Sequence, residues 1–381
     1  LRLVGSEMCI RDRFQSFVFY HVIFASILWL LWLGSRNRTL ANLGVLILIL
    51  VSIFRFDIGN DYENYMLIIE DSKRLFQSCD SMWNTLFVNS TYFGIEPIFE
   101  LLIWIFHVLD NTYLYVIGLY SLLFILIIYK VLEENGELFW GMFIVFALPI
   151  LFTSYDQIRQ AVSIAIFIYA IKYIEKGDFK HYCYCMLLAS LFHFSALLIT
   201  PIYIIRKIKP RIKFYCLVVL IMYIGLLFDF WSQFRLLLFN SIGLYSHYAE
   251  SDRQLGAMEY SSGLGILFLM LFYSFLMVKM AHRKPVYSNL LFCGLVLLLF
   301  STGNLNIDRM SNYFCWVSVL AFPAFIKYER RRLIILCSVL LLMVYFERNL
   351  VGGVRGCIPY DSVFSENFEN KRLRIRWYNF D

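Results

Sequence analysis

Long apolar stretches recur along the whole chain, and short polar connections separate them. Twelve such stretches can be recognised, each of roughly 14–24 residues, close to the ~20 that a helix needs to cross a bilayer. They cover residues 16–33, 39–54, 97–110, 112–131, 138–154, 158–174, 182–205, 213–229, 262–280, 287–302, 311–327 and 332–346. The pattern predicts an all-α, polytopic integral membrane bundle of about twelve transmembrane helices. The short stretches 39–54 and 97–110 are candidates for half-helices or re-entrant segments.

Three longer polar stretches interrupt this pattern, at 55–96, 231–261 and 348–381. Four connections between apolar stretches are basic: 35–38, 206–213, 279–284 and 327–332. If every apolar stretch crossed the membrane, all four would lie on one side, and the positive-inside rule assigns that side to the cytoplasm. The polar stretches 55–96 and 231–261 and the tail would then face outward.

Strict alternation leaves two conflicts in the middle of the chain. It places the lysine-containing connection 172–180 outside, and it places Arg159 on the cytoplasmic side, opposite the other polar clusters. A re-entrant segment within 97–110 or 182–205 would change this parity.

The ends of the chain differ in character from the rest. Residues 1–13 (LRLVGSEMCIRDR) do not begin with methionine and do not fit a signal peptide, so we expect them to be a non-native leader. The membrane domain is then expected over 14–347, with an extramembrane tail over 348–381. No single linker divides this domain in two.

Composition supports the membrane assignment and narrows the class. The chain is 60% hydrophobic and 16% charged, whereas a soluble domain is typically about 45–50% apolar and 25% charged. Soluble enzymes, nucleic-acid-binding domains and disulfide-stapled folds are therefore excluded. Most of the nine cysteines lie inside apolar stretches, where they act as small hydrophobic residues, so neither a metal nor another cofactor is predicted.

A first polar cluster, FRFDIGNDYENY, follows the second apolar stretch. Arg55, Asp57, Asp61 and Tyr62 could clamp a charged headgroup or form a general base with its orienting partner. The alternative is a solvated loop with an internal salt bridge. Glu96 opens the third apolar stretch, where a carboxylate is also simply favourable at a helix N-terminus.

Three further polar sites lie at or within apolar stretches, where such residues are expensive. Arg159, followed by Gln160, carries a planar fork suited to phosphate, unless it is a snorkelling interfacial side chain. His193 is either a proton acceptor for a sugar hydroxyl or a hydrogen-bonded core residue. Arg309 and Tyr313 would share one helical face, which also suits a capped helix start with an interfacial belt.

These motifs, taken in order, resemble the EpsG family of bacterial polysaccharide-biosynthesis membrane proteins. The matching segments are FRFDIGNDYENY, EP at 96–97, RQAVSIAI at 159–166, LFHFSAL at 191–197, DRMSNYF at 308–314 and PYDSVF at 359–364. The resemblance implies a membrane polymerase, related in role to the Wzy O-antigen polymerases. Such an enzyme joins oligosaccharide repeat units carried on undecaprenyl diphosphate, at the outer face of the bacterial inner membrane, to make exopolysaccharide, capsule or O-antigen.

On this reading, Arg159 and Arg309 bind the donor diphosphate and stabilise its leaving charge. Asp57, Asp61, Glu96 or His193 deprotonates the acceptor hydroxyl, and Arg55, Tyr62, Gln160 and Tyr313 contact the substrate. The implied partners are the lipid-linked oligosaccharide, the bilayer and other polysaccharide-assembly proteins.

Three other functions fit the same residues. The first is a flippase or exporter of lipid-linked oligosaccharide, although the halves of the chain show no internal repeat of the kind common in transporters. The second is a membrane acyltransferase that modifies the polysaccharide, and the third is a transporter of a soluble sugar or ion.

Overall fold

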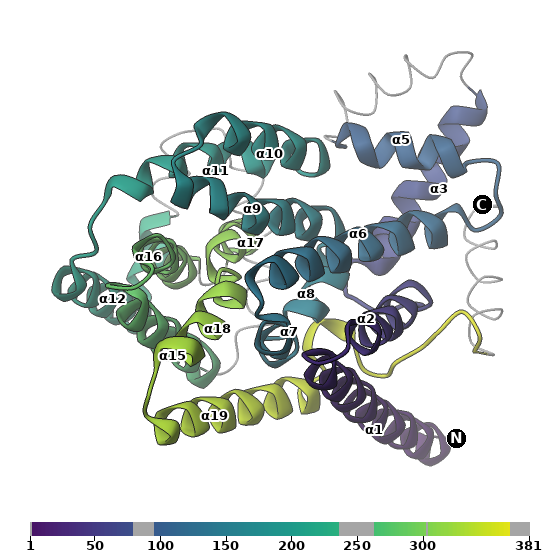
Figure 1. Ribbon diagram of the computed structural model, residues 1–381. Helices are drawn as coiled ribbons and strands as arrows, with labels where there is room; N and C mark the ends of the chain where they lie inside the picture. Colours follow the sequence, from purple (N-terminus) through teal and green to yellow (C-terminus); the bar gives the residue numbers. More distant parts are fainter. Residues whose placement is uncertain (1, 79–94, 236–262, 302–303, 366–381) are drawn as a thin grey trace. The chain divides into compact units, whose positions relative to one another are not determined.

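A computed structural model describes residues 2–78, 95–235, 263–301 and 304–365, with side chains from residue 13 onward. Helices account for the regular structure of these residues, and no strand occurs among them apart from one isolated bridge. The predicted all-helical architecture is confirmed (Figure 1).

The chain forms two compact units, each built from non-contiguous segments. The first comprises Leu1–Tyr169, Met186–Leu197 and Leu340–Asp381, and the second comprises Ala170–Cys185 and Leu198–Val339. The boundaries fall inside helices and not between them, which explains why no linker marks them in the sequence.

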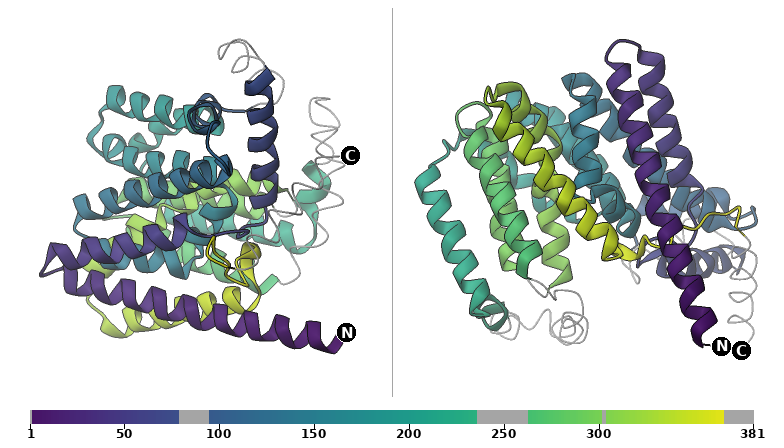
Figure 2. Two further views of the ribbon diagram at one scale, coloured as in Figure 1. Left: turned by 90° about the vertical axis from the view of Figure 1, so that its right-hand side faces the viewer. Right: turned by 90° about the horizontal axis from the view of Figure 1, so that it is seen from below.

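Eight helices among the described residues contribute to the first unit before its boundary at residue 169. They are α1 (Arg2–Gly34), α2 (Arg38–Ile53), α3 (Tyr62–Ser78), α5 (Pro97–Phe106), α6 (Thr112–Asn135), α7 (Leu138–Ala147), α8 (Ile150–Asp156) and the first part of α9 (Ile158–Lys176). Helices α1 and α2 pack side by side, as the purple ribbons of Figure 2 show, and α2 packs in turn against α6.

Helix α3 is a departure from the loop predicted over 55–96. Its composition is polar overall, but Tyr62, Tyr65, Met66 and Ile69 are buried at i, i+3, i+4 and i+7, which places them on one face. Ser72 on the same helix donates to Glu100 of α5 at 3.1 Å. This half-apolar periodicity was obscured by the charged residues on the opposite face. The remainder of that stretch, 79–94, lies outside the described residues, as does most of the predicted loop 231–261.

Three apolar stretches that were predicted as single spans are broken helices. Helices α7 and α8 meet at an angle of 61°. The stretch 182–205 is divided into α10 (Phe179–Phe192), α11 (Ser195–Ile199) and the 3-10 helix η1 (Thr200–Lys207). The stretch 311–327 is divided between α17 (Leu305–Cys315) and α18 (Ser318–Tyr328).

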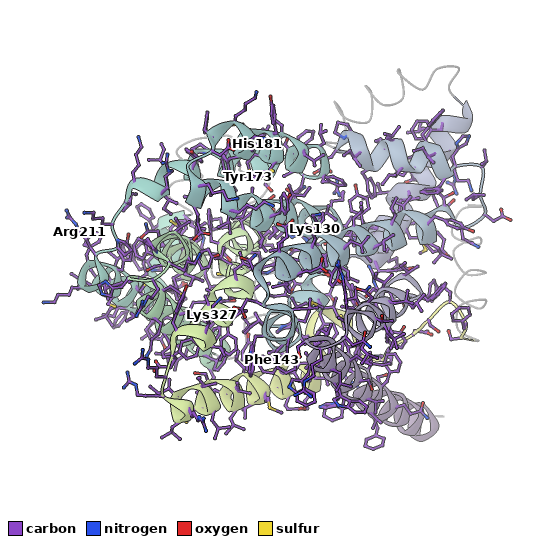
Figure 3. The ribbon with its side chains drawn as sticks, viewed as in Figure 1. Lys130, Phe143, Tyr173, His181, Arg211 and Lys327 are labelled. Carbon is purple, nitrogen blue, oxygen red and sulfur yellow. The ribbon has the colours of Figure 1, made fainter. Side chains whose placement is uncertain are left out.

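The chain folds back on itself on both sides of α10. Between α9 and α10 it turns at Gly177, whose φ of +78° favours glycine, and Tyr173 and His181 stack across the turn at 5.4 Å (Figure 3). After α10, η1 returns alongside its first residues: Tyr182 Oη donates to the carbonyl of Thr200 at 3.1 Å, and Phe179 meets Tyr203 at 4.9 Å.

The second unit is organised around α16 (Pro285–Phe300). It packs against α12 (Ile212–Leu227), α15 (Gly263–Met280) and α17. The buried Asn289 of α16 accepts from Tyr215 Oη of α12 at 2.8 Å and donates to the carbonyl of Ile208 at 2.7 Å. The first part of α19 (Arg332–Val351) also belongs to this unit.

Four of the described helices are long and apolar enough to cross a membrane, and the bent α7–α8 pair makes a fifth if it counts as one span. The four are Arg13–Gly34, Thr112–Asn135, Gly263–Met280 and Arg332–Val351. The protein is therefore an integral membrane protein, but about twelve crossings are not confirmed. Helices such as α2, with 16 residues, extend about 24 Å, which is less than the ~30 Å hydrocarbon core.

Candidate functional site

The carboxylate of Glu96 is the centre of a buried polar group in the first unit. Glu96 precedes Pro97, the first residue of α5, and its side chain is only 2% exposed. Its Oε1 accepts a hydrogen bond from Nδ1 of His193, and its Oε2 forms an ion pair with Nη1 of Arg159. Both carboxylate oxygens thus have a strong partner, which is the condition for burying a charge.

Two breaks in the helices place the partners of Glu96. Arg159 lies in the first turn of α9, just after the break at Gln157 that separates α8 from α9, and His193 follows the last residue of α10. The guanidinium of Arg159 lies over the rings of Phe99 and Tyr65, at 5.2 and 5.7 Å from their centroids. Such contacts hold the cation in place while it remains accessible. The side chains of Arg159 and His193 are 21% and 28% exposed, so this group reaches from a buried carboxylate to the surface.

The environment of Glu96 favours its ionised form. Burial alone would raise the pKa of Glu96, but the hydrogen bond from His193 and the charge of Arg159 hold that pKa below its ordinary value. An ionised carboxylate can only accept hydrogen bonds, so Nδ1 of His193 carries a proton, and in the neutral form of the ring the lone pair then lies on Nε2. Glu96 therefore orients His193 in the tautomer that a general base requires.

Arg55 forms a second group in the same unit, and it is 1% exposed. Its Nη1 donates to the carbonyl of Ser52 at 2.6 Å and to Oγ of Ser121 at 2.5 Å, and its guanidinium stacks 4.1 Å above the ring of Tyr155. Within the part of the chain that the structure describes, no carboxylate pairs with Arg55. Burial consequently lowers the pKa of Arg55 from its ordinary value.

Asp156, at the end of α8, joins two segments that are distant in the sequence. Its Oδ1 accepts from the backbone N–H of Asp61 at 3.1 Å, and its Oδ2 pairs with Nη1 of Arg355 at 3.0 Å. Gly59 approaches the same helix with a φ of +108°, and a Cβ there would lie 3.0 Å from the carbonyl oxygen of Tyr155. The turn 57–61 is thus fitted closely against α8.

The C-terminal motif joins the first polar cluster. Arg55 and Ser362 form an antiparallel bridge, in which the N–H of Phe56 donates to Asp361 at 3.0 Å and that of Val363 donates to Phe54 at 3.0 Å. Two motifs that the sequence separates by about 300 residues therefore form one piece of structure.

The other predicted site residues occupy different positions. Asp57 is exposed at a φ of +53°, and Asp61 is half-buried. Tyr62 is buried at the start of α3, and Gln160 is buried beside Arg159 on α9. Arg309 and the buried Tyr313 lie one turn apart on α17, which belongs to the second unit.

The structure thus shows that Glu96, Arg159 and His193 are in contact, which the sequence alone did not predict. Sequence reasoning also missed Arg355 and Ser121. Arg355 lies 199 residues from its partner Asp156, and Ser121 is one hydroxyl in a long apolar helix, so neither carries a local signal. Among the side chains described, no group of three or more His, Cys, Asp and Glu residues is arranged to hold a metal ion.

Comparison with known proteins identifies a family. A family model described as the EpsG family matches residues 38–362, which is most of the chain and includes Arg55, Glu96, Arg159 and His193. No match was found in comparisons with curated proteins or with solved structures.

Proposed function

Because this chain belongs to the EpsG family and is an exopolysaccharide-related membrane protein, we propose that it is a polysaccharide polymerase. It joins oligosaccharide units carried on undecaprenyl diphosphate by glycosyl transfer, at the outer face of the bacterial inner membrane. This substrate, this location and the enzymatic activity are all part of the proposal.

The observation that carries the proposal is the pairing of Glu96 with His193. His193 Nε2 accepts the proton of the acceptor sugar hydroxyl, whose oxygen attacks the anomeric carbon of the donor. The bond between that carbon and the phosphate oxygen breaks, and the diphosphate leaves with the electron pair. The proton passes from His193 to solvent. General-base catalysis of this type contributes about 10²–10⁴-fold to a rate.

Arg159 supplies electrostatic stabilisation in this scheme. Its guanidinium is anchored by Glu96 and by two aromatic rings, so it can face a developing negative charge with little reorganisation. Arg309 and Tyr313, on α17 of the second unit, are proposed as contacts for a lipid-linked diphosphate, and Gln160 is proposed to contact the sugar. Asp57 and Asp61 stay alternative base candidates, and the preference for His193 rests on its hydrogen bond to Glu96.

A second candidate function is supported by the same pairing. A histidine that is oriented by a carboxylate also activates a sugar hydroxyl for acyl transfer, so a membrane acyltransferase fits Glu96 and His193 equally well. A flippase, in contrast, has no need of an oriented base.

The test uses purified protein in nanodiscs with an undecaprenyl-diphosphate oligosaccharide from the native host. Product length is followed on a gel, and release of undecaprenyl diphosphate is measured in parallel. We expect wild type to give a ladder and His193→Gln to give none. His107→Gln is the matched control, because His107 lies in another apolar stretch and its ring bonds to the carbonyl of Trp104, three residues earlier in the chain. An intact wild type that forms no ladder and releases no lipid diphosphate would refute the polymerase.

A further inference from the structure

Arg55 is the one residue of the two polar groups whose charge the described structure leaves without an opposite charge. Burying a guanidinium is strongly unfavourable unless an anion or a full set of acceptors replaces water. The ring of Tyr155 at 4.1 Å and the two bonds of Nη1 compensate only in part. A buried arginine without an opposite charge therefore indicates a functional role and not a stabilising one.

Two nitrogens of Arg55, Nε and Nη2, are buried and have no hydrogen-bond partner among the described residues. The hydroxyl of Tyr62 is also buried and has no hydrogen-bond partner among the described residues. The ring of Tyr62 packs against that of Phe56, which follows Arg55 in the chain, with 5.8 Å between the ring centroids, and the phenol interacts electrostatically with Arg55. The two side chains together present several donors that need an acceptor. An acceptor with several oxygens and negative charge, such as phosphate, matches a guanidinium fork and a phenol at once.

The C-terminal strap, residues 354–365, covers this group. Ser362 of the strap pairs with the backbone of Arg55, and Cys357 and Tyr360 interact electrostatically with its guanidinium. The strap is fastened by hydrogen bonds: Tyr20 Oη donates to Cys357 at 2.8 Å, and Tyr360 Oη donates to Val51 at 3.1 Å. A ligand can reach Arg55 from this side only if the strap moves.

An ion pair also fastens the strap, and we call this pair the latch. Arg355, at a φ of +55°, lies between two glycines with positive φ and pairs with Asp156 at 3.0 Å. Gly353 and Gly356 permit the backbone to change direction at low cost. When the strap opens, Arg355 leaves Asp156, so that a second guanidinium is available near the same place.

From these observations we propose that Arg55 and Tyr62 form a phosphate-binding subsite, which the C-terminal strap closes and the Arg355–Asp156 pair latches. The ligand is a diphosphate. This inference rests on the proposed function for its choice of the lipid-linked diphosphate as the natural source, and a free diphosphate is the other source.

The test measures binding and not turnover, so that it can succeed or fail independently of the polymerase. Full-length protein in nanodiscs is titrated with undecaprenyl diphosphate, with undecaprenol, which lacks phosphate, and with inorganic pyrophosphate. We expect wild type to prefer undecaprenyl diphosphate over undecaprenol by about tenfold or more, and Arg55→Gln to lose this preference. Arg55→Lys should recover part of it. Arg36→Gln is the control, because Arg36 is an exposed arginine of the same unit.

The outcomes separate the sources and the hypotheses. A loss confined to undecaprenyl diphosphate identifies the lipid headgroup as the ligand, and an equal loss for pyrophosphate identifies the free anion. An unchanged preference in Arg55→Gln, or an equal loss in Arg36→Gln, overturns the subsite. Binding that depends on Arg55 in a protein that forms no ladder supports the subsite and refutes the polymerase.

A second measurement tests the strap without altering Arg55. Cys357 is fully buried, so alkylation by N-ethylmaleimide, followed by mass spectrometry of its peptide, reports opening. We expect Asp156→Asn to speed this alkylation by about fivefold or more, since it removes the latch. Undecaprenyl diphosphate should slow the alkylation again, because a diphosphate bound to Arg55 holds the strap in place. An alkylation rate that neither change affects would show that the strap does not open.

Discussion

Arg355 donates to the buried carboxylate of Asp156 at 3.0 Å, although 199 residues separate the two along the chain. The same carboxylate accepts the backbone N–H of Asp61 through its other oxygen. Asp156 is therefore the point at which α8, the turn before α3 and the C-terminal strap are held together.

Asp156→Ala should lower the free energy of unfolding by about 2–3 kcal/mol. Breaking a fully buried ion pair costs roughly 3–5 kcal/mol, and the 21% exposure of the Arg355 side chain reduces that figure. Thermal unfolding in detergent provides the measurement. Asp71→Ala is the control, because Asp71 pairs with Arg74 at 3.8 Å on an exposed surface, where about 0.5 kcal/mol or less is expected. Equal effects of the two substitutions would contradict the role of Asp156.

Glu96 and His193 should act as a unit in catalysis. His193→Gln is expected to lower kcat by about 10²–10⁴-fold, and Glu96→Gln to lower it substantially as well, because the amide no longer fixes the ring tautomer. The double variant should be little worse than His193→Gln alone, since groups that serve one step are not additive. Release of undecaprenyl diphosphate measures the rate. If the rate loss of the double variant equalled the product of the two single losses, the residues would serve separate steps.

The lowered pKa of Glu96 predicts a pH dependence of stability. A carboxyl group whose pKa is depressed by folding stabilises the folded state above its unfolded pKa, near the ordinary value of 4.5, and loses this contribution as the pH falls through the folded value. The stability difference between wild type and Glu96→Gln should therefore be constant above about pH 5 and shrink below it. Thermal unfolding of both proteins at a series of pH values tests this. A difference that grows toward acid pH would reverse the sign and refute the ionised state of Glu96.

Gly59→Ala should destabilise the protein by about 1–3 kcal/mol, because alanine at a φ of +108° is strained and its Cβ would meet the carbonyl of Tyr155. Gly136→Ala is the matched control. Its φ of +68° is also positive, but no atom lies within 4 Å of the added Cβ, so only the smaller backbone cost is expected. Circular dichroism melts of the two variants should rank Gly59→Ala as the less stable.

Apolar length predicted the helices but not their breaks. Residues 182–205 are mostly apolar, and the sequence offered them as one possible re-entrant segment without locating the break. The chain breaks at His193, whose ring is bonded to Glu96 beside a different helix. The stretch 138–154 hides a 61° bend in the same way. Conversely, α3 was missed because its buried face is half the helix and charged residues occupy the other half. These features depend on partners distant in sequence, and a single sequence does not specify them.

Contacts at the site also resolve the parity conflict at Arg159. Strict alternation of twelve crossings places Glu96 and Arg159 on opposite sides of the membrane, but the two side chains form an ion pair. At least one apolar stretch between them therefore does not cross completely. Either of two segments accounts for this. One is α5 in the stretch 97–110, a predicted re-entrant candidate, whose 10 residues extend about 15 Å. The other is the α7–α8 pair, whose bend of 61° suits a segment that enters the membrane and returns.

The structure also indicates that residues 179–207 form a re-entrant segment. This predicts that both ends of the segment lie on the same side of the membrane. The first residues of α10 lie beside η1, as the contacts of Tyr182 with Thr200 and of Phe179 with Tyr203 show. The chain therefore enters and leaves this segment on one side. Asp178 precedes α10 and Lys207 ends η1, so both should face the cytoplasm together with the basic connection 206–213.

Single cysteines at these two positions test that claim. Asp178→Cys and Lys207→Cys are introduced separately into a background without accessible cysteines and labelled with a membrane-impermeant maleimide. Both should react in inverted membrane vesicles and resist labelling in intact spheroplasts, as should Arg36→Cys, which the positive-inside rule also assigns to the cytoplasm. Labelling of Asp178→Cys from outside, with Lys207→Cys labelled from inside, would mean that residues 179–207 cross the membrane. The packing of α10 against η1 would then need another explanation, since two ends on opposite sides of a ~30 Å core cannot touch.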